Sequence, residues 1–135
     1  MGSFLLFLFS CKESSNIKMI ESNFIYEKPP FIECHASSIE ELSDGNIVIA
    51  AFGGTKEKNK DVTIWLSKKG TDKWQSPKLI ADGIINDSLR YPTWNPVLFR
   101  TMSDILYLYY KVGPSPREWW GEYIFSTDQG ENWSE

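Results

Sequence analysis

Short apolar runs separated by turn residues fill the chain from residue 35 onward. The runs at 35–42, 46–52, 61–67 and 74–80 each favour a strand, and the first two flank Ser43-Asp44-Gly45, a hairpin signal. None of these runs keeps the 3.6-residue period of an amphipathic helix. The pattern therefore predicts an all-β chain that begins with a four-stranded antiparallel meander.

A second series of strand-like runs follows at 94–99, 105–110 and 123–126 and predicts a second, incomplete meander. Trp74 and Trp133 lie 59 residues apart, and each stands seven residues after a serine. Four-stranded units that recur at a fixed period are typical of β-propeller blades. We therefore expect two blades, at about residues 31–85 and 90–135.

The segment that ends at Trp133 carries a complete Ser-x-Asp-x-Gly-x-x-Trp motif. Its residues are Ser126, Asp128, Gly130 and Trp133. An aspartate accepts turn amides, a glycine adopts positive φ, and a tryptophan packs across a sheet. The motif resembles the Asp box of sialidase-type propellers, where it is structural and lies away from the active site.

Further segments extend this resemblance to one bacterial family, the predicted neuraminidases with BNR (Asp-box) repeats. They are residues 33–37, 52–54, 90–99 and 110–121. The resemblance implies a six-bladed propeller. Family members are well over twice the length of this chain, so it predicts an amino-terminal part with about two blades, the second of them incomplete. We expect such a part to be catalytically incompetent by itself.

The amino terminus resembles an export signal. The apolar run at residues 4–9 is too short to span a bilayer, and it ends at Ser10-Cys11 as in a bacterial lipobox. We therefore expect residues 1–11 to be a signal peptide, Cys11 to be lipidated, and residues 12–30 to form a tether and a possible closing strand. The protein would then lie in the bacterial cell envelope, on the outer membrane or cell surface, or otherwise in the periplasm or medium. The alternatives are a buried apolar segment and a disulfide between Cys11 and Cys34.

Composition narrows the classes of function. Hydrophobic residues make up 41% of the chain and aromatic residues 15%, which predicts a packed core. The net charge of −4, with no basic run longer than a pair, argues against nucleic-acid binding. Two cysteines and one histidine do not make a closed Cys/His zinc site. We expect neither a metal nor an organic cofactor.

His35 is the first candidate catalytic residue. The resemblance places it at the start of an innermost strand, where sialidases carry the arginine of an Arg-Ile-Pro motif that binds the sialic acid carboxylate. The sequence here is Cys34-His35-Ala36. A histidine at this place would act as a general acid or base, or would bind a uronate carboxylate when protonated. An ordinary polar residue is the alternative.

The loop at residues 53–61 corresponds to the segment in which sialidases hold their acid/base aspartate. It contains Glu57 and Asp61, and glycosidases need such a carboxyl group to protonate the leaving oxygen. Asp61 directly precedes a predicted strand, so its backbone should be the better fixed of the two. A solvated loop charge is the alternative.

Expected substrate-binding residues come from the second meander. Arg90 matches a carboxylate bidentately, with a surface salt bridge as the alternative. Trp94 and Asn95 are expected at the mouth of the propeller, and Trp94 is equally compatible with the core. The loop at 111–121 offers cations and flat aromatic faces for an acidic sugar, namely Lys111, Arg117, Trp119 and Trp120. One of those two tryptophans should anchor the core.

Three functions follow from these residues. The first is an exported, sialidase-like exo-glycosidase that hydrolyses a terminal, acidic sugar of a glycan. The second is a polysaccharide lyase in which His35 removes the proton α to a uronate carboxylate and Arg90 neutralises the acid. The third is a glycan-binding propeller without catalysis.

Overall fold

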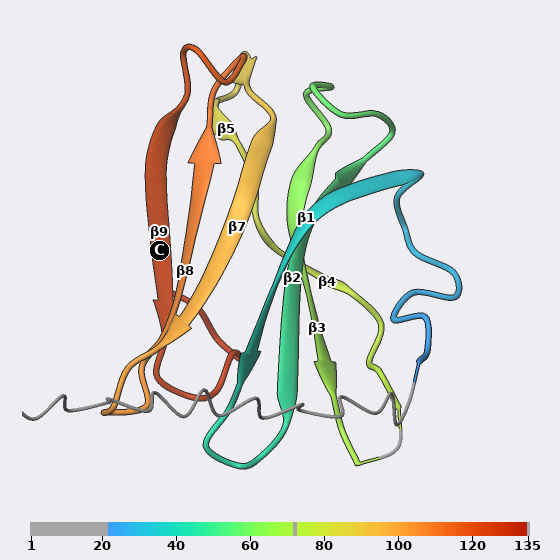
Figure 1. The fold of residues 1–135 in the computed structure, drawn as a ribbon. Coiled ribbons are helices and arrows are strands. Elements are labelled where there is room, and N and C mark those ends of the chain that lie inside the picture. The colour runs from blue at the N-terminus through green and yellow to red at the C-terminus, as the bar shows by residue number, and fades with distance from the viewer. Residues whose placement is uncertain (1–21, 72, 135) are drawn as a thin grey trace, which may run out of the picture.

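The computed structural model describes residues 22–71 and 73–134, which form three antiparallel sheets (Figure 1). The first sheet has the order β1-β2-β3-β4. Its strands are β1 (Glu33–Glu41), β2 (Ile47–Gly54), β3 (Thr63–Lys69) and β4 (Lys78–Ala81). The expected meander and the all-β class are thus confirmed for the described residues.

The third sheet repeats this arrangement with three strands. They are β7 (Thr93–Arg100), β8 (Leu106–Val112) and β9 (Trp120–Ser126). In chain order, a small hairpin that the sequence pattern did not predict comes between β4 and β7; its strands are β5 (Ile84–Asn86) and β6 (Leu89–Arg90). Its strands are too short to show an apolar alternation.

The two large sheets share one register. Each cross-strand pair between β1 and β2, from Cys34↔Gly53 to Glu41↔Ile47, has a counterpart between β7 and β8 at positions 59 residues later. Both first strands carry a bulge at the same place, with positive φ at Ala36 (49°) and at Asn95 (42°). Bulges redirect side chains and occur often beside functional sites. The 59-residue repeat is therefore confirmed at the level of backbone pairing.

The equal spacing from Ser67 to Trp74 and from Ser126 to Trp133 suggests that the two serines are counterparts, and the strand pairing shows that they are not. Lys69 pairs with Ile47, whereas Ser126 pairs with Leu106, and Ile47 and Leu106 are equivalent in the repeat. Lys69 is therefore the true counterpart of Ser126. The turn after β3 is two residues shorter than the turn after β9, so the equal serine-to-tryptophan spacing does not reflect equal structure.

Two other expected elements differ from the structure. The strand expected at 74–80 is shorter, because β4 begins only at Lys78, directly after a proline that lacks an N–H donor, and Trp74 forms an isolated bridge with Lys69. Residues 22–30 form no strand, so the closing strand expected within 12–30 is absent from its described part. Residues 1–21, with the expected signal peptide and Cys11, lie outside the described residues.

The core lies between the two large sheets. The first sheet contributes alternate residues of β2 and β3, and the second contributes alternate residues of β7, β8 and β9. The main members are Val48, Ala50, Ile64, Leu66, Trp94, Leu98, Leu106, Leu108 and Ile124. β2 is buried on both faces because residues 22–32 cover the opposite face of its sheet, where the Phe31 ring lies 5.4 Å from the Trp65 ring (Figure 1).

Hydrogen bonds between β1 and β7 also link the two large sheets. The Leu98 N–H donates to the Ser38 Oγ at 2.9 Å, and the Arg100 Nε donates to the carbonyl of Glu41 at 2.8 Å. Strands β1 and β7 begin at one end of the molecule, and the β2–β3 and β8–β9 loops lie at this end as well (Figure 1). The β1–β2 and β7–β8 turns and the turn after β9 lie at the opposite end. The predicted sites and the predicted structural turn therefore separate in space.

The Asp-box turn has the expected geometry. The Ser126 hydroxyl donates to Asp128 Oδ1 at 2.7 Å, and the Asn132 N–H donates to the same oxygen at 2.9 Å. Gly130 has a φ of 85°, and a Cβ there would lie 3.5 Å from both Leu66 and Leu106. The turn thus packs against both sheets. Hydrogen bonds from the amide and side chain of Asn132 lower the pKa of Asp128 to about 2.

Candidate functional site

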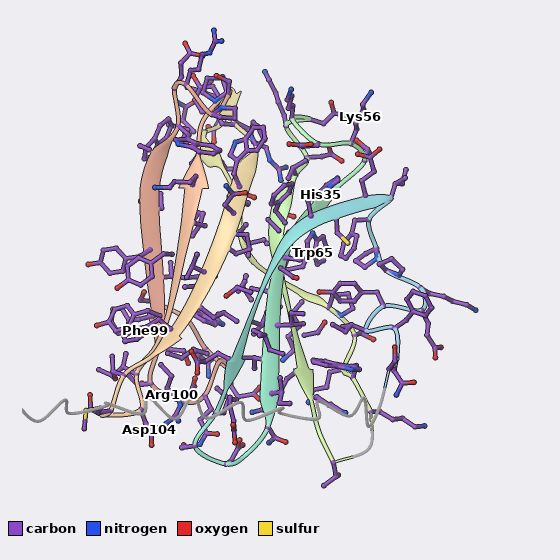
Figure 2. The ribbon with its side chains drawn as sticks, in the orientation of Figure 1. His35, Lys56, Trp65, Phe99, Arg100 and Asp104 are labelled. Carbon is purple, nitrogen blue, oxygen red and sulfur yellow. The ribbon has the colours of Figure 1, made fainter. Side chains whose placement is uncertain are left out.

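An open hollow of about 560 Å³, lined largely by charged residues, lies where β1 begins. It combines cationic, anionic and polarisable side chains from β1 and from the β2–β3 loop. The lining residues are Ile32, Glu33, Cys34, His35, Lys56, Glu57 and Lys58. Figure 2 shows His35 and Lys56 at the same end of the molecule. His35 and Glu57, two of the residues singled out from the sequence, are brought together here.

His35 stays accessible while its imidazole has defined neighbours. Its side chain is 49% exposed, and Nε2 lies 3.9 Å from Glu33 Oε2. The ring centre lies 5.6 Å from that of Phe52, the residue opposite it on β2. The bulge that follows His35 shifts the register of β1 against β2, and pairing resumes at Ser38. The imidazole is therefore placed for contact with a ligand that enters the hollow.

The loop at residues 55–61 is closed at its base by Asp61. Asp61 Oδ2 accepts the Thr55 N–H at 2.8 Å, and Oδ1 accepts the Thr55 hydroxyl at 3.0 Å. Asn59 adds a bond to the Thr55 hydroxyl at 2.9 Å. Both oxygens of Asp61 are engaged, and Asp61 does not line the hollow. Asp61 therefore holds the base of the loop together, and Glu57 is the carboxylate of this loop that lines the hollow.

Sequence reasoning missed Glu33, Lys56 and Lys58. Glu33 Oε2 accepts the Glu57 N–H at 3.1 Å, so this carboxylate ties the loop to β1 beside His35. Lys58 has a φ of 77°, an unusual backbone for a non-glycine residue and one that recurs at functional sites. Two features of the sequence could have identified these residues. They are the alternating charges of the loop and the i, i+2 spacing of Glu33 and His35.

Trp94 lies in the core, which is the alternative given for it in the sequence analysis, and not at the mouth with the other expected substrate-binding residues. It is 2% exposed, and its Nε1 donates to the Gly113 carbonyl at 2.9 Å. Its ring lies 5.7 Å from that of Trp119, which packs against the core as well. Trp120, in contrast, is 39% exposed and donates to Glu122 Oε1 at 2.5 Å. Trp119 is therefore the core anchor of the two tryptophans.

The other expected substrate-binding residues do not line the hollow around His35. Asn95 is exposed at the bulge of β7, and Arg117 is exposed in the β8–β9 loop. Lys111 lies on β8 rather than in the expected loop, opposite Trp94. Arg90 is half-buried at the end of β6, and among the described residues its Nε has no hydrogen-bond partner. These four residues stay predicted contacts of a larger site.

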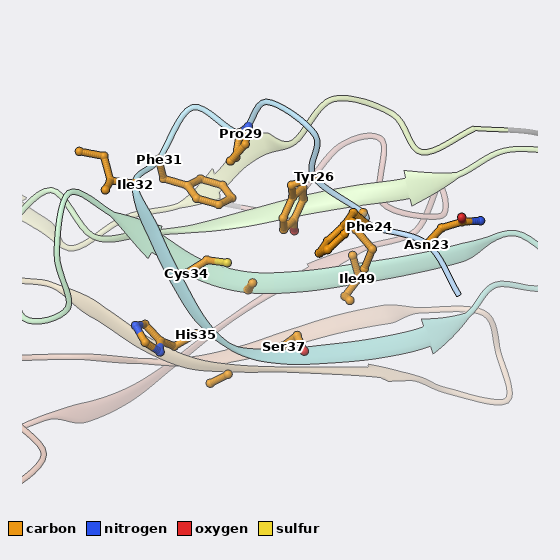
Figure 3. A pocket seen from close by; sticks show the side chains of 13 residues that line it. Asn23, Phe24, Tyr26, Pro29, Phe31, Ile32, Cys34, His35, Ser37 and Ile49 are labelled. Carbon is orange, nitrogen blue, oxygen red and sulfur yellow. The ribbon is translucent and has the colours of Figure 1, made fainter. Parts of the chain in front are cut away.

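A second hollow, of about 530 Å³, lies on the other side of β1 (Figure 3). It is bounded by the segment at 22–32 and by the first sheet, and its lining is mainly apolar. Cys34 and His35 line both hollows. Burial raises the pKa of Tyr26, which lines the second hollow. Cys34 is exposed as a free thiol, and its alternative partner Cys11 lies outside the described residues.

Two features are absent from the part of the chain that the structure describes. Within residues 22–71 and 73–134, no three His, Cys, Asp or Glu side chains gather in a way that would hold a metal ion. In the same residues, no helix has the length and apolar character to cross a membrane.

Comparison with known proteins gives a family and a fold. A family model described as the BNR repeat-like domain matches residues 45–135. A crystal structure of a protein of unknown function from Dyadobacter fermentans DSM 18053 is similar, with a TM-score of 0.58 and 15% sequence identity. The similarity covers 76% of this chain and 35% of that one, so this chain spans about a third of its solved neighbour. None of the curated proteins matches the sequence.

Proposed function

Because this chain belongs to the BNR repeat-like domain family, we propose that it supplies the first two blades of an exported, sialidase-like, six-bladed propeller that hydrolyses a terminal acidic sugar of a glycan. The observation that carries the proposal is the hollow in which His35 lies beside Lys56, Lys58 and Glu57. It opens at the end of the sheets opposite the Asp-box turn. Shared register of the two sheets, with matching bulges, supports the blade arrangement.

The hollow holds two lysines and two glutamates, so its formal charge is balanced, and the lysines are the groups that would bind an anionic substrate. Lys56 and Lys58 offer ammonium groups to a carboxylate, and a protonated His35 adds a third donor. On the second sheet Arg90, Asn95, Lys111 and Arg117 would extend the contacts, and the exposed face of Trp120 would accept the C–H face of a sugar ring. A uronic or sialic acid fits these donors better than a neutral sugar.

Hydrolysis needs one group that protonates the leaving oxygen. Glu57 is the favoured carboxyl group, because its backbone is held by Glu33 and its side chain reaches the hollow. His35 would serve as a second acid or base. The nucleophile or the base that activates water would come from the remaining blades.

A lyase is the second candidate function, and the position of Asp61 favours it. Because both Asp61 oxygens are bound to Thr55, the usual acid/base aspartate is not free at this place. A lyase needs a base for the proton α to a uronate carboxylate and a cation that stabilises the resulting charge. His35 and Lys56 would supply these, with Arg90 as a further cation.

An activity assay separates the candidates. The complete propeller, with this chain as its first two blades, is incubated with uronic-acid and sialic-acid oligosaccharides, and released reducing ends and near-ultraviolet absorbance are followed together. Hydrolysis gives reducing ends alone, whereas a lyase also gives an unsaturated uronide that absorbs. His35→Gln and Glu57→Gln should abolish turnover, while Glu27→Gln, on the exposed amino-terminal segment, should not. Binding without turnover would favour a non-catalytic glycan-binding propeller, the third class.

We also propose a lipid anchor on Cys11 and a location in the cell envelope. A serine directly before this cysteine, after the apolar run, supports the proposal. Incorporation of a labelled fatty acid in a bacterial host, and its loss in Cys11→Ser, tests it. If the unchanged protein and Cys11→Ser are both unlabelled and both remain in the soluble fraction, the lipid anchor is contradicted.

A further inference from the structure

The turn after β9 carries side chains that the Ser-x-Asp-x-Gly-x-x-Trp pattern does not specify, and these side chains reach the first sheet. Within the turn, the Ser126 hydroxyl and the Asn132 side chain bond to Asp128. Gln129 and Glu131 occupy two x positions of the pattern. Figure 1 shows the segment after β9 turning toward the end of the molecule where β1 passes into β2. The side-chain partners of Gln129 and Glu131 lie there, on a different sheet.

Gln129 contacts Asp44, which lies in the β1–β2 turn. With the amide oriented so that its nitrogen faces Asp44, Nε2 donates to Oδ2 at 2.8 Å and lies 3.2 Å from Oδ1. Gln129 has a φ of 61°, a left-handed conformation that is unfavourable for a residue with a Cβ. Such a conformation persists where the surrounding structure holds it, and the bond to Asp44 contributes to this.

Glu131 contacts two lysines of the first sheet. Its Oε1 lies 3.4 Å from Lys68 Nζ on β3, and its Oε2 lies 3.6 Å from Lys78 Nζ on β4. Lys68 Nζ also lies 3.9 Å from Asp44 Oδ2. The Lys68 side chain is only 14% exposed, so solvent and salt screen its charge less than that of an ordinary surface lysine. Lys68 therefore joins the carboxylate of the β1–β2 turn to the carboxylate of the Asp-box turn.

The second sheet does not repeat these contact points. In the register of the sheets, Asp44 has Ser103 as its counterpart, and Lys68 has Phe125. A serine and a phenylalanine offer neither the carboxylate that Gln129 binds nor the ammonium group that Glu131 binds. The side chains at these two x positions thus match the first sheet.

We propose that Gln129 and Glu131 make the Asp-box turn a clamp between the two large sheets, one that recognises a carboxylate and a pair of lysines on the preceding sheet. The fixed residues of the motif form the turn, whereas its variable positions select the sheet that the turn binds. Selection by charge works through repulsion as well as attraction, so a residue of the wrong sign at position 131 should be rejected. The clamp goes beyond the proposed glycan site and depends neither on catalysis nor on further blades.

Double-mutant cycles on the full chain, followed by urea denaturation, test both contacts. Gln129→Ala and Asp44→Ala should show a coupling of about threefold in the unfolding equilibrium constant, because each variant alone breaks the same bond. Lys68→Met and Glu131→Gln should show a coupling of about twofold to fivefold. Gln129→Ala with Ser103→Ala, at the counterpart of Asp44, is the matched control and should be additive. Additivity in either of the first two cycles would overturn the clamp.

Amide hydrogen exchange separates a clamp from a turn that is stable only in itself. Gln129→Ala leaves the bonds to Asp128 in place. We therefore expect faster exchange on the first sheet, at the Gly45 and Asn46 N–H groups of the β1–β2 turn, by at least about twofold. Gln129→Gly, which relieves the left-handed backbone, should give the same result. Faster exchange confined to the turn after β9 would show that Gln129 acts locally, and the clamp would be wrong.

Charge reversal tests the selection. Glu131→Lys places an ammonium group beside Lys68 and Lys78, and it should raise the unfolding equilibrium constant at least about threefold more than Glu131→Gln does. Glu27→Lys, on the exposed amino-terminal segment, makes the same change of net charge and is the matched control, which should have little effect. Equal effects of Glu131→Lys and Glu131→Gln would show that position 131 does not select its partner by charge.

Discussion

At the scale of single residues, Asp128 shows how one carboxylate organises a turn. It accepts bonds from the Ser126 hydroxyl and from both nitrogens of Asn132, although it is exposed to solvent. Each of these bonds favours the ionised form, which is why the pKa falls to about 2. The residue types of the motif were sufficient to predict this turn, because all of its bonds are local.

The lowered pKa of Asp128 predicts an acid-dependent loss of stability. A carboxyl group with a folded pKa of about 2 and an ordinary value of 3.8 stabilises the fold above pH 3.8, and this contribution is lost as the pH falls toward 2. Asp128→Asn should lower the free energy of unfolding at pH 6 and flatten its decline between pH 4 and pH 2. Urea denaturation across this range checks both effects, and an unchanged acid slope would contradict the assignment.

Substitution of the two adjacent tryptophans is expected to lower the free energy of unfolding by different amounts. Trp119→Ala removes a ring that packs on Trp94 and should cost about 2–3 kcal/mol, below the value for a fully buried ring. Trp120→Ala removes a ring that is 39% exposed, lies 5.8 Å from the Tyr91 ring and donates to Glu122, and it should cost about 1 kcal/mol, less than Trp119→Ala. Chemical denaturation of both variants measures the difference. Equal losses would show that Trp119 does not pack on Trp94 more closely than Trp120 packs on its own neighbours.

The candidate site was only partly predictable from the sequence. His35 and Glu57 were identified because the resemblance placed them, whereas Glu33 and Lys56 join the site through a contact between β1 and a loop more than 20 residues away. Asp61 looked well placed in sequence, but its hydrogen bonds to Thr55 depend on the folded loop. The type of a residue indicates which reaction its side chain could support, whereas tertiary contacts decide whether that side chain is free to take part.

At the scale of elements, local turn chemistry predicted the hairpins well and predicted strand ends poorly. Ser43-Asp44-Gly45 gives the expected turn, in which Asp44 accepts the Asn46 N–H at 2.9 Å and Gly45 has a φ of 79°. This bond from the Asn46 backbone lowers the pKa of Asp44. The strand expected at 74–80 was shorter in the structure, because pairing to β3 and a proline decide where β4 begins.

Gly45→Ala tests the turn. A Cβ at this position would meet no heavy atom within 4 Å, so the cost is that of the backbone conformation, about 1 kcal/mol. Its counterpart Asp104 adopts a φ of 61° and forms an ion pair with Arg100 at 2.6 Å. Asp104→Gly should therefore change stability by less than Gly45→Ala, because relief of the backbone offsets the lost exposed ion pair. Urea denaturation of the two variants decides this, and a larger loss in Asp104→Gly would contradict the assigned equivalence.

At the scale of the whole molecule, the two large sheets share one core and are expected to unfold together. Core residues from both sheets form one cluster, and the Asp-box turn contacts Leu66 of the first sheet and Leu106 of the second. Far-ultraviolet circular dichroism and tryptophan fluorescence should therefore give coincident unfolding curves. Two separated transitions would show that each sheet folds independently.

His35 is proposed to belong to a site for acidic sugars, and this can be measured directly. His35 is the single histidine among the 135 residues, so its imidazole resonances can be followed without ambiguity in the full chain. Titration with an oligosaccharide that ends in a uronic acid should shift these resonances saturably. The neutral analogue should have little effect, and Lys56→Gln should weaken the response while Glu27→Gln should not. Unchanged His35 resonances with every acidic sugar, or an equal response to the neutral one, would show that His35 does not belong to an acidic-sugar site.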